Sequence, residues 1–245
     1  MSQITTNPQS DDGHSIFVTR HGARIDWVDK NWLLEAERPQ DPPLSSQGER
    51  QVTIAAVELG EALAISHIKR IYCSPLYRTL QTATQVADRL NIPIFVEYGL
   101  HEWSSPESVP QPLPLHQLKE LFPKIDTSYV SNQSLPDRES REQFTARVQR
   151  TAEFLESTFA TSEGSLLAVT HASSVVTLGR ALLRDYHATV RSGVCSISRY
   201  DGKPQAWTHA FNGSSAHLKE GEVANWEFAE DVEARERAER LTAQP

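Results

Sequence analysis

One short stretch does most to decide the fold class: GSLLAVT, at Gly164–Thr170, is an almost unbroken run of apolar residues. Such a run is typical of a strand that is covered on both faces, as the strands of a parallel sheet are. Along the rest of the chain, strand-like segments alternate with segments whose apolar residues recur at helical spacing. We therefore predict a three-layer α/β/α sandwich around a mainly parallel central sheet.

The remaining strands and helices are predicted in the same way, from strand-like apolar runs and from apolar residues at helical spacing. Further strands are predicted at Ser15–Arg20, Ile68–Ser74 and Ile94–Glu97, with a closing hairpin at Gly193–Tyr200 and Gln205–Phe211. Helices are predicted at Ser45–Ala64, Pro75–Leu90, Leu115–Phe122, Asp137–Thr161 and Ala172–Leu183. Pro75 is expected near the first position of its helix, where the missing N–H does no harm.

The length of 245 residues suits one large α/β domain, which we assign to residues 15–228. Residues 1–14 are polar and lack the basic and apolar regions of a secretory signal, so we expect a disordered leader. Residues 229–245 are dense in Glu and Arg, and we expect a solvated helix or a frayed, charged tail.

Charge and cysteine content narrow the classes of partner. A net charge of −8 disfavours direct binding to nucleic acid or to an anionic membrane, and no apolar run approaches the length that crosses a bilayer. Cys73 and Cys195 lie in apolar stretches outside any Cys/His ligand cluster, so we expect free, buried thiols. Free thiols favour a reducing compartment, here the cytoplasm, the nucleus or both.

Three predicted strands end in residues suited to phosphate chemistry. The first ends in Arg20-His21-Gly22-Ala23-Arg24, the second leads into Arg78, and the apolar strand ends at His171. Ligands of such sheets bind beyond the carboxyl ends of the strands, so we expect these side chains to converge on one rim. A single histidine at a strand end is more often structural than catalytic. The evidence for a catalytic site is that histidines and arginines occur together, each at a predicted strand-to-helix junction.

The residue types in this set match phosphoryl transfer. Arginine forks fit phosphate oxygens bidentately and can stabilise charge on a transferring phosphoryl group. A neutral histidine can attack phosphorus and carry the group covalently. Gly22 would allow a close backbone approach after His21, and His171 would begin a helix whose free N–H groups favour an anion.

These segments resemble three signatures of the histidine phosphatase (phosphoglycerate mutase-like) superfamily. Val18–Arg24 is similar to its Arg-His-Gly signature, and Ser74–Ala83, SPLYRTLQTA, is similar to Ser-Pro-x-x-Arg-x-x-Gln-Thr-Ala. Thr170–Ser174 resembles the third signature, and the resemblance covers roughly Ile16 to Leu183. It implies a phosphoglycerate mutase-like fold and a hydrolase that uses neither a cofactor nor a metal.

The resemblance also implies a role for each matching residue. His21 would be the nucleophile and Glu102 the general acid, with His171 as the second histidine of the phosphate pocket. The phosphate-binding arginines would be Arg20, Arg24 and Arg78. A carboxyl beside Trp103 could be partly desolvated, which suits a general acid.

Finer features resemble two branches of the superfamily. The run from Arg24 to Trp27, followed by Lys30-Asn31-Trp32, is similar to the Sts/UBASH-type phosphatases. Arg191–Ser196 and Asn225–Phe228 resemble the histidine-phosphatase domain of the fungal tau subunit of transcription factor IIIC. Chemistry gives no reason for these last two segments, and closure of the sheet edge is the plainer explanation.

We therefore expect a phosphomonoester hydrolase that acts through a phosphohistidine on His21. Its substrate would be a phosphorylated small molecule or a phosphoprotein, with aryl phosphates and phosphotyrosine among the candidates. Trp27, Trp32 and Trp103 could form an apolar rim for such a group, or could simply pack the loops. Glu139 and Arg147 could reach the pocket mouth, although a solvated helix face is the expectation.

Two alternatives stay open. A non-catalytic or weakly catalytic partner protein of a transcription factor IIIC-like complex would use the pocket only to bind or to assemble. A phosphoglycerate mutase shares the chemistry, but Arg24 departs from the pattern of the glycolytic enzymes. Neither the substrate nor the oligomeric state follows from the sequence.

Overall fold

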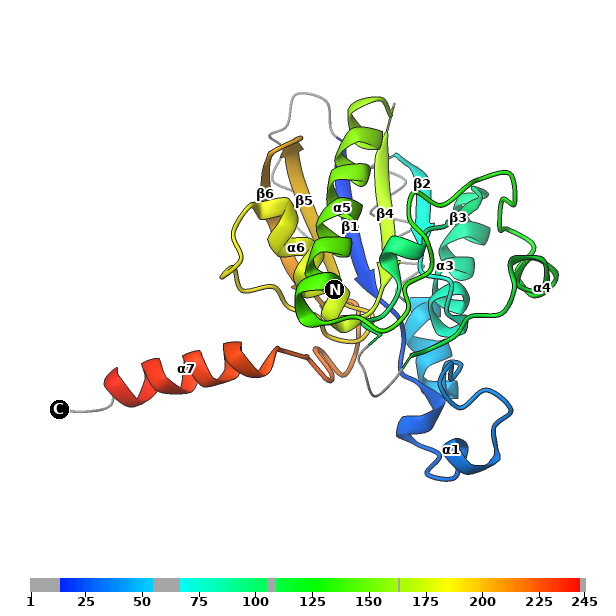
Figure 1. Ribbon diagram of the computed structural model, residues 1–245, viewed down its shortest axis with the longest axis horizontal. Helices are drawn as coiled ribbons and strands as arrows, with labels where there is room; N and C mark the ends of the chain where they lie inside the picture. The colour runs from blue at the N-terminus through cyan, green and yellow to red at the C-terminus, as the bar shows by residue number, and fades with distance from the viewer. Residues whose placement is uncertain (1–13, 55–66, 105–108, 163, 243–245) are drawn as a thin grey trace.

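The computed structural model describes residues 14–54, 67–104, 109–162 and 164–242, and its centre is a six-stranded sheet (Figure 1). The strands are β1 (Ser15–Arg20), β2 (Ile68–Cys73), β3 (Ile94–Val96), β4 (Ser165–Thr170), β5 (Ile197–Lys203) and β6 (Ala206–Ser214). Their order across the sheet is β3-β2-β4-β1-β5-β6. The pairs among β1 to β4 are parallel, whereas β5 pairs antiparallel with β1 and β6 with β5. The predicted mainly parallel sheet is confirmed.

Helices cover both faces of this sheet. On one face, the core of buried side chains joins α5 (Arg141–Ala160) and α6 (Ala172–Leu183) to residues such as Val18 and Leu166. On the other, α3 (Tyr77–Leu90) and α4 (Leu115–Leu121) meet Phe17 and Leu167. Neighbouring residues of β1 and β4 thus point into opposite cores, as the period of two in a strand requires. The predicted three-layer α/β/α sandwich is confirmed.

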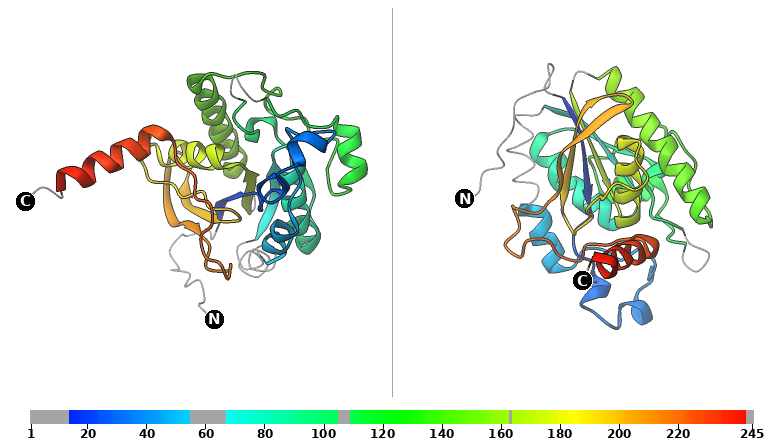
Figure 2. Two further views of the ribbon diagram at one scale, coloured as in Figure 1. Left: turned by 90° about the horizontal axis from the view of Figure 1, so that it is seen from below. Right: turned by 90° about the vertical axis from the view of Figure 1, so that its left-hand side faces the viewer.

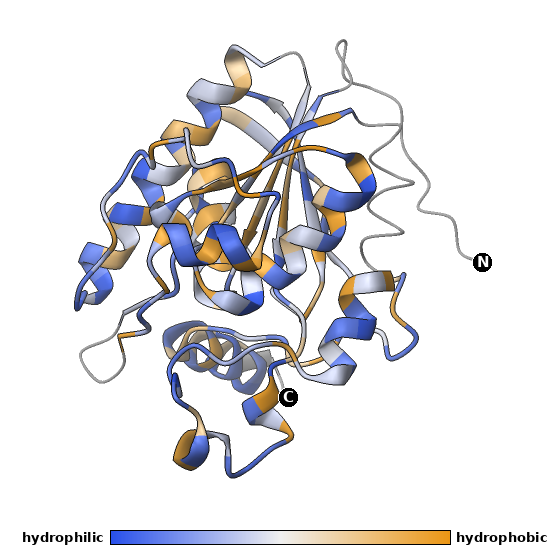
Figure 3. Cartoon of the chain, turned by 90° about the vertical axis from the view of Figure 1, so that its right-hand side faces the viewer, coloured by the Kyte–Doolittle hydropathy of each residue, from blue (hydrophilic) through white to orange (hydrophobic). Residues whose placement is uncertain are grey.

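The hydropathy of the chain follows the same layers. β4 lies in the middle of the sheet and is buried along its whole length, which explains its nearly unbroken apolar sequence. Figure 3 shows hydrophobic residues concentrated on the central strands, with hydrophilic ones on the outer sides of the helices. Among the described residues, no helix is both long and apolar enough to cross a membrane.

Three short helices lie near the carboxyl ends of the parallel strands. They are η1 (Ile25–Trp27), α1 (Trp32–Glu35) and η2 (Tyr98–Leu100). A further helix begins at residue 46 and is described as far as residue 54, so the rest of the predicted helix Ser45–Ala64 lies outside the described residues. α7 (Ala229–Thr242) is the last helix, and Figure 1 and the left view of Figure 2 show it projecting away from the sheet.

Two helices begin later than predicted, each because of a specific cap. α5 begins at Arg141 instead of Asp137, since Ser140 and Gln143 form a capping box. α3 begins at Tyr77, which leaves Pro75 outside the helix. The carboxylate of Asp41 accepts a hydrogen bond from the backbone N–H of Tyr77 at 2.9 Å, so a distant residue caps this helix.

The closing hairpin is also displaced from its predicted position. β5 begins at Ile197 instead of Gly193, because residues 193–196 form a turn in which Cys195 has a φ of +53°. Both strands extend further than predicted, to Lys203 and Ser214. The segment before β5 is therefore a loop, and it passes close to the end of β1.

Candidate active site

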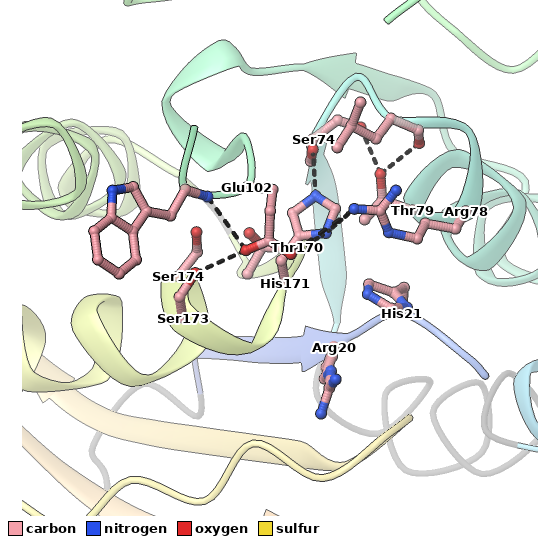
Figure 4. A network of polar contacts seen from close by, with 12 residues as sticks. Arg20, His21, Ser74, Arg78, Thr79, Glu102, Thr170, His171, Ser173 and Ser174 are labelled. Atoms are coloured by element: carbon pink, nitrogen blue, oxygen red, sulfur yellow. Dashed lines mark hydrogen bonds and ion pairs between the residues drawn. The ribbon is translucent and has the colours of Figure 1, made fainter. Parts of the chain in front are cut away.

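The predicted site residues meet at one edge of the sheet because β4 lies between β2 and β1. The carboxyl ends of these three parallel strands are therefore adjacent. His21 follows β1, Arg78 lies in the first turn of α3 after β2, and His171 follows β4 as the N-cap of α6. Figure 4 shows the two imidazole rings and the Arg78 guanidinium facing one another.

His21 is buried, and its hydrogen bond determines which tautomer it adopts. Nδ1 lies 2.7 Å from the carbonyl oxygen of Gly22. A carbonyl can only accept, so Nδ1 carries the proton and Nε2 keeps a free lone pair. Burial, followed by the nearby charges of Arg78 and Arg20, lowers the pKa of His21 well below its usual value. The ring is therefore neutral at physiological pH.

Gly22 permits the turn that places this ring. A Cβ atom at this position would lie 2.8 Å from the carbonyl oxygen of Gly48 and 2.8 Å from a methyl group of Val52. The helix that begins at residue 46 packs directly against the turn, and any side chain at residue 22 would push the two apart.

His171 is fully buried and has the opposite tautomer. Its Nδ1 lies 3.2 Å from Nη2 of Arg78, and its Nε2 lies 2.8 Å from Oγ of Ser74. A guanidinium can only donate, so Nδ1 accepts and Nε2 donates its proton to Ser74. Burial, and then the charges of Arg78 and His21, lower the pKa of His171 well below its usual value. Its ring centroid is 5.2 Å from that of His21.

Arg78 and Arg20 bring buried positive charge to the two histidines. Arg78 is 1% exposed, and its Nε and Nη1 have no hydrogen-bond partner; the same holds for Nε of Arg20. Burial lowers the pKa of each guanidinium to about 10, so both stay charged at neutral pH. Unpartnered buried donors are costly, and an anion with several acceptor oxygens would satisfy them.

Arg20 is held in place with the help of Arg191–Ser196 and Asn225–Phe228, the two segments for which the sequence suggested no chemical role. Its Nη1 donates to the carbonyl oxygens of Ser192 at 2.8 Å and Ala224 at 2.7 Å. Ser192 in turn binds the following segment, since its Oγ donates to the carbonyl oxygen of Trp226 and its N–H to Asn225. Arg191–Ser196 and Asn225–Phe228 thus help to orient Arg20.

Arg24 lies at the edge of the site and forms an ion pair with Asp26. Its Nε and Nη2 donate to the two carboxylate oxygens of Asp26, at 2.9 and 2.5 Å. The side chain is 27% exposed. Its charge is close enough to contribute to the lowered pKa of Arg78. Arg24 therefore belongs to the site, but its fork is directed at Asp26.

Glu102 lies beside the two pocket residues with which it would have to act. One carboxylate oxygen accepts from Oγ of Ser173 at 2.7 Å. The other lies 3.4 Å from Nδ1 of His171 and 3.8 Å from Nη2 of Arg78. The carboxyl is 23% exposed, so water can reach it while it remains next to the buried charges.

Of the three tryptophans proposed as a rim, Trp27 is the one that borders the site. Its ring lies 6.4 Å from that of His21, and the guanidinium carbons of Arg20 and Arg24 lie 5.6 and 5.7 Å from its centroid. Trp103 turns away from Glu102 and stacks on Phe144 at 5.5 Å. Trp32 is in α1, where its indole N–H is buried without a hydrogen-bond partner.

Two further carboxylates have structural roles beside the site, and of these only Asp41 was missed from the sequence. Asp41 is buried and lies 3.6 Å from Nη1 of Arg78, and burial raises its pKa. Glu139 forms a bidentate pair with Arg147, with both distances at 2.7 Å. Arg147 is only 3% exposed, so the expectation of a solvated helix face is wrong.

Three of these residues also have the spacing of a metal site. Ligand atoms of His21, Glu102 and His171 lie within 4.8 Å of one another, which is the spacing of a metal cluster. However, the Arg78 guanidinium approaches Nδ1 of His171, and the charges of Arg20 and Arg24 oppose a cation. The arrangement fits an oxyanion better than a metal ion.

The fold and this edge define a class: an α/β sandwich with buried arginines around a neutral histidine, built to receive a phosphate-like anion. The model of the histidine phosphatase superfamily (branch 1) matches residues 16–212. The chain belongs to this superfamily, and the predicted family is confirmed.

Relatives include proteins of both expected branches. The chain is 27% identical over 264 residues to the transcription factor tau 55 kDa subunit of Saccharomyces cerevisiae, in a match that covers 88% of this chain and 58% of that one. It is 30% identical over 240 residues to ubiquitin-associated and SH3 domain-containing protein A of Mus musculus, covering 77% and 38%. The chain thus spans little more than half of the first relative and less than half of the second.

Solved structures show the same fold. The ecdysone phosphate phosphatase from Bombix mori, in complex with tungstate, superposes with a TM-score of 0.68 at 19% identity. The superposition covers 82% of this chain and 93% of that one. The phosphoglycerate mutase-like sandwich predicted from the sequence is therefore confirmed.

Proposed function

We propose that the chain hydrolyses phosphomonoesters through a phosphohistidine on Nε2 of His21. One observation carries the proposal: a buried, neutral His21 with its lone pair on Nε2 lies close to the charges of Arg20 and Arg78, whose guanidinium groups keep donors without a hydrogen-bond partner. A phosphate group would satisfy those donors and present its phosphorus to the lone pair. The relatives named for phosphatase activity support the same chemistry.

In the first step, Nε2 of His21 attacks phosphorus while the bond from phosphorus to the ester oxygen breaks. Protonated Glu102 gives its proton to the departing oxygen, and an alcohol or phenol leaves. Arg20, Arg78 and His171 stabilise the charge that spreads over the equatorial oxygens.

In the second step, a water molecule attacks the phosphohistidine. The Glu102 carboxylate takes a proton from that water, the bond from phosphorus to Nε2 breaks, and inorganic phosphate is released. The 23% exposure of the Glu102 side chain is consistent with the second role, since water has to reach the carboxylate that the first step leaves.

The leaving group would lie against Trp27, whose ring borders His21 and two arginines. An indole face stacks well on an aromatic or other apolar group. We therefore propose aryl or apolar phosphomonoesters, including phosphotyrosine in a protein, as the substrate class.

The test compares wild type with His21→Ala on an aryl phosphate at mildly acidic pH. We expect a loss of at least about 10³-fold in kcat/KM, because no other group can carry the phosphoryl. His116→Ala, at an exposed position of α4, is the matched control and keeps wild-type activity. Mass spectrometry of acid-labile phosphate on His21 after quenching detects the intermediate. Phosphate release that is unchanged in His21→Ala contradicts the proposal.

We further propose that the reaction needs no metal ion, because Arg78 approaches the nitrogen of His171 that a metal would use. Activity should be unchanged in EDTA. Restoration of activity by Zn²⁺ or Mn²⁺ after chelation would show instead that the two histidines and Glu102 bind a metal.

A second function is favoured by one observation, the similarity to the tau 55 kDa subunit across 88% of this chain. We propose it as the alternative: a partner protein of a transcription factor IIIC-like complex, located in the nucleus, with weak or no catalysis. Absence of a phosphoenzyme, together with stable co-purification of such a complex, would favour it over the hydrolase. A phosphoglycerate mutase is a weaker candidate, and interconversion of the monophosphoglycerates faster than their hydrolysis would establish it.

A further inference from the structure

Arg147, in the second turn of α5, is buried against the loop that carries Glu102. All five of its N–H donors are used. Nε and one Nη2 donor bind the two carboxylate oxygens of Glu139, each at 2.7 Å. Nη1 donates to the carbonyl oxygens of Gly99 at 2.8 Å and His101 at 3.0 Å. The second Nη2 donor binds the carbonyl oxygen of Glu102 at 3.3 Å.

Glu139 holds the same loop from its other end. Its backbone N–H donates to the carbonyl oxygen of Ser104 at 2.7 Å, and its own carbonyl accepts from the indole of Trp103 at 3.2 Å. Arg147 and Glu139 therefore bind the backbone on both sides of Glu102. They make this attachment as one unit, since the carboxylate of Glu139 also fixes the guanidinium.

Arg147 and Glu139 differ from an ordinary buried ion pair, because Arg147 also donates hydrogen bonds to backbone carbonyls. A buried pair by itself is weak evidence for stability, because desolvation offsets much of the attraction. Here three donors go to three carbonyls of one short loop, Gly99–Glu102, which has to stay in place for the carboxyl to be useful. Only a planar guanidinium can bind the carboxylate and these carbonyls together.

We propose that Arg147, fixed by Glu139, is a positioning residue that holds the Glu102 carboxyl over the phosphate pocket. The proposal rests on the proposed function, in which Glu102 is the general acid. In the position that Arg147 would maintain, the Glu102 carboxylate lies 3.4 Å from Nδ1 of His171. Arg147 touches neither His171 nor Arg78 in the contacts described, so its effect would pass through the loop that carries Glu102.

The test uses the different needs of two leaving groups. An aryl phosphate with an acidic phenol hardly needs a proton donor, whereas an alkyl phosphate requires one. The readout is kcat/KM, which covers the steps up to departure of the leaving group. Glu102→Gln provides the reference for loss of the acid. Arg147→Lys is the principal variant, because it keeps a positive charge beside Glu139 but loses the fork.

Arg184→Lys is the matched control. Arg184, at the end of α6, pairs at 2.5 Å with Glu156, which lies in α5 as Arg147 does. Arg184 makes no described contact with residues 99–104. Glu139→Gln is the second variant, which removes the charge that fixes Arg147 and nearly preserves shape. Circular dichroism and the Tm establish that each variant is folded.

We expect Arg147→Lys to lower kcat/KM for the alkyl phosphate by roughly 10- to 100-fold and for the aryl phosphate by less than about 3-fold. Glu139→Gln should follow the same pattern, and Arg184→Lys should match wild type on both esters. Equal losses on the two esters, or no loss, in folded Arg147→Lys and Glu139→Gln would overturn the positioning role alone. If wild type hydrolyses neither ester, or does so without His21, the proposed function fails and this inference with it.

Discussion

Nδ1 of His171 accepts a hydrogen bond from Nη2 of Arg78 at 3.2 Å, in the interior of the protein. This contact uses one donor of a fully buried guanidinium and leaves its Nε and Nη1 without partners. The interior at this point therefore holds positive charge whose hydrogen bonds are incomplete. Such a site is preorganised for an oxyanion, and this arrangement underlies the first prediction.

Replacing Arg78 by Met should strongly reduce activity without unfolding the protein. We expect kcat/KM to fall by roughly 10²- to 10³-fold, because a preorganised donor to the phosphoryl group is lost. The Tm without ligand should change little, because a desolvated charge is removed while Asp41 keeps its ion pair with Arg38. Thermal unfolding with and without orthovanadate is the measurement, and vanadate should raise the Tm of wild type only. An equal rise in Arg78→Met would contradict the assignment.

Buried neutral histidines should make the fold less stable in acid. Burial lowers the pKa of His101 to about 3, and its Nδ1 donates to the carbonyl oxygen of Glu102. Between about pH 6.5 and the folded pKa, the unfolded histidine binds a proton that the folded one does not. Stability is therefore lost as the pH falls through this range, by about 1.4 kcal/mol per pH unit for each such group.

Urea unfolding of wild type and His101→Gln at pH 5.5 and 4.5 measures this effect. The variant should lose less stability over that interval, with a difference in slope of about 1.4 kcal/mol per pH unit. Equal slopes would mean that His101 is protonated in the folded protein. His116→Gln, at an exposed position, serves as the control and should keep the wild-type slope.

Asp26 competes with phosphate for the fork of Arg24. Asp26→Asn removes the charge that holds this fork, so we expect phosphate or vanadate to bind about 2- to 5-fold more tightly, as for a partly exposed pair. Competitive inhibition of aryl phosphate hydrolysis gives the Ki. Asp29→Asn makes the same change in charge at an exposed position nearby and should leave the Ki as it was. Weaker binding in Asp26→Asn would show that the pair is the active arrangement.

Trp27 should determine preference for the leaving group. Trp27→Ala should raise KM for an aryl phosphate by about 5- to 10-fold, because an aromatic stacking contact is lost. The Ki of inorganic phosphate, which has no leaving group, should change much less. Tyr186→Ala is the comparison, since it removes an exposed aromatic side chain beyond the carboxyl end of α6, at the opposite end of that helix from His171. Equal changes in the KM and the Ki would place Trp27 outside the leaving-group site.

Much of the fold and of the site could be predicted from the sequence because both are recorded in local patterns. An apolar run at Gly164–Thr170 and helical spacing elsewhere determined the layers, since burial on one or two faces dictates the period. His21, Arg78 and His171 could be brought together because the carboxyl ends of parallel strands share one edge. Helix starts were less accurate, because a remote carboxylate such as Asp41 can cap a helix.

Only the tertiary structure decided how the site residues are held and charged. Arg20 is oriented by carbonyls 172 and 204 positions away, and Arg147 reaches back to a loop more than 40 positions earlier. The sequence identified which residues lie at the strand ends. It did not identify which neighbouring segments would bury them and exclude water. Burial, together with the nearby charge of Arg78, sets the protonation of His21 and His171, and that burial arises only when distant segments pack together.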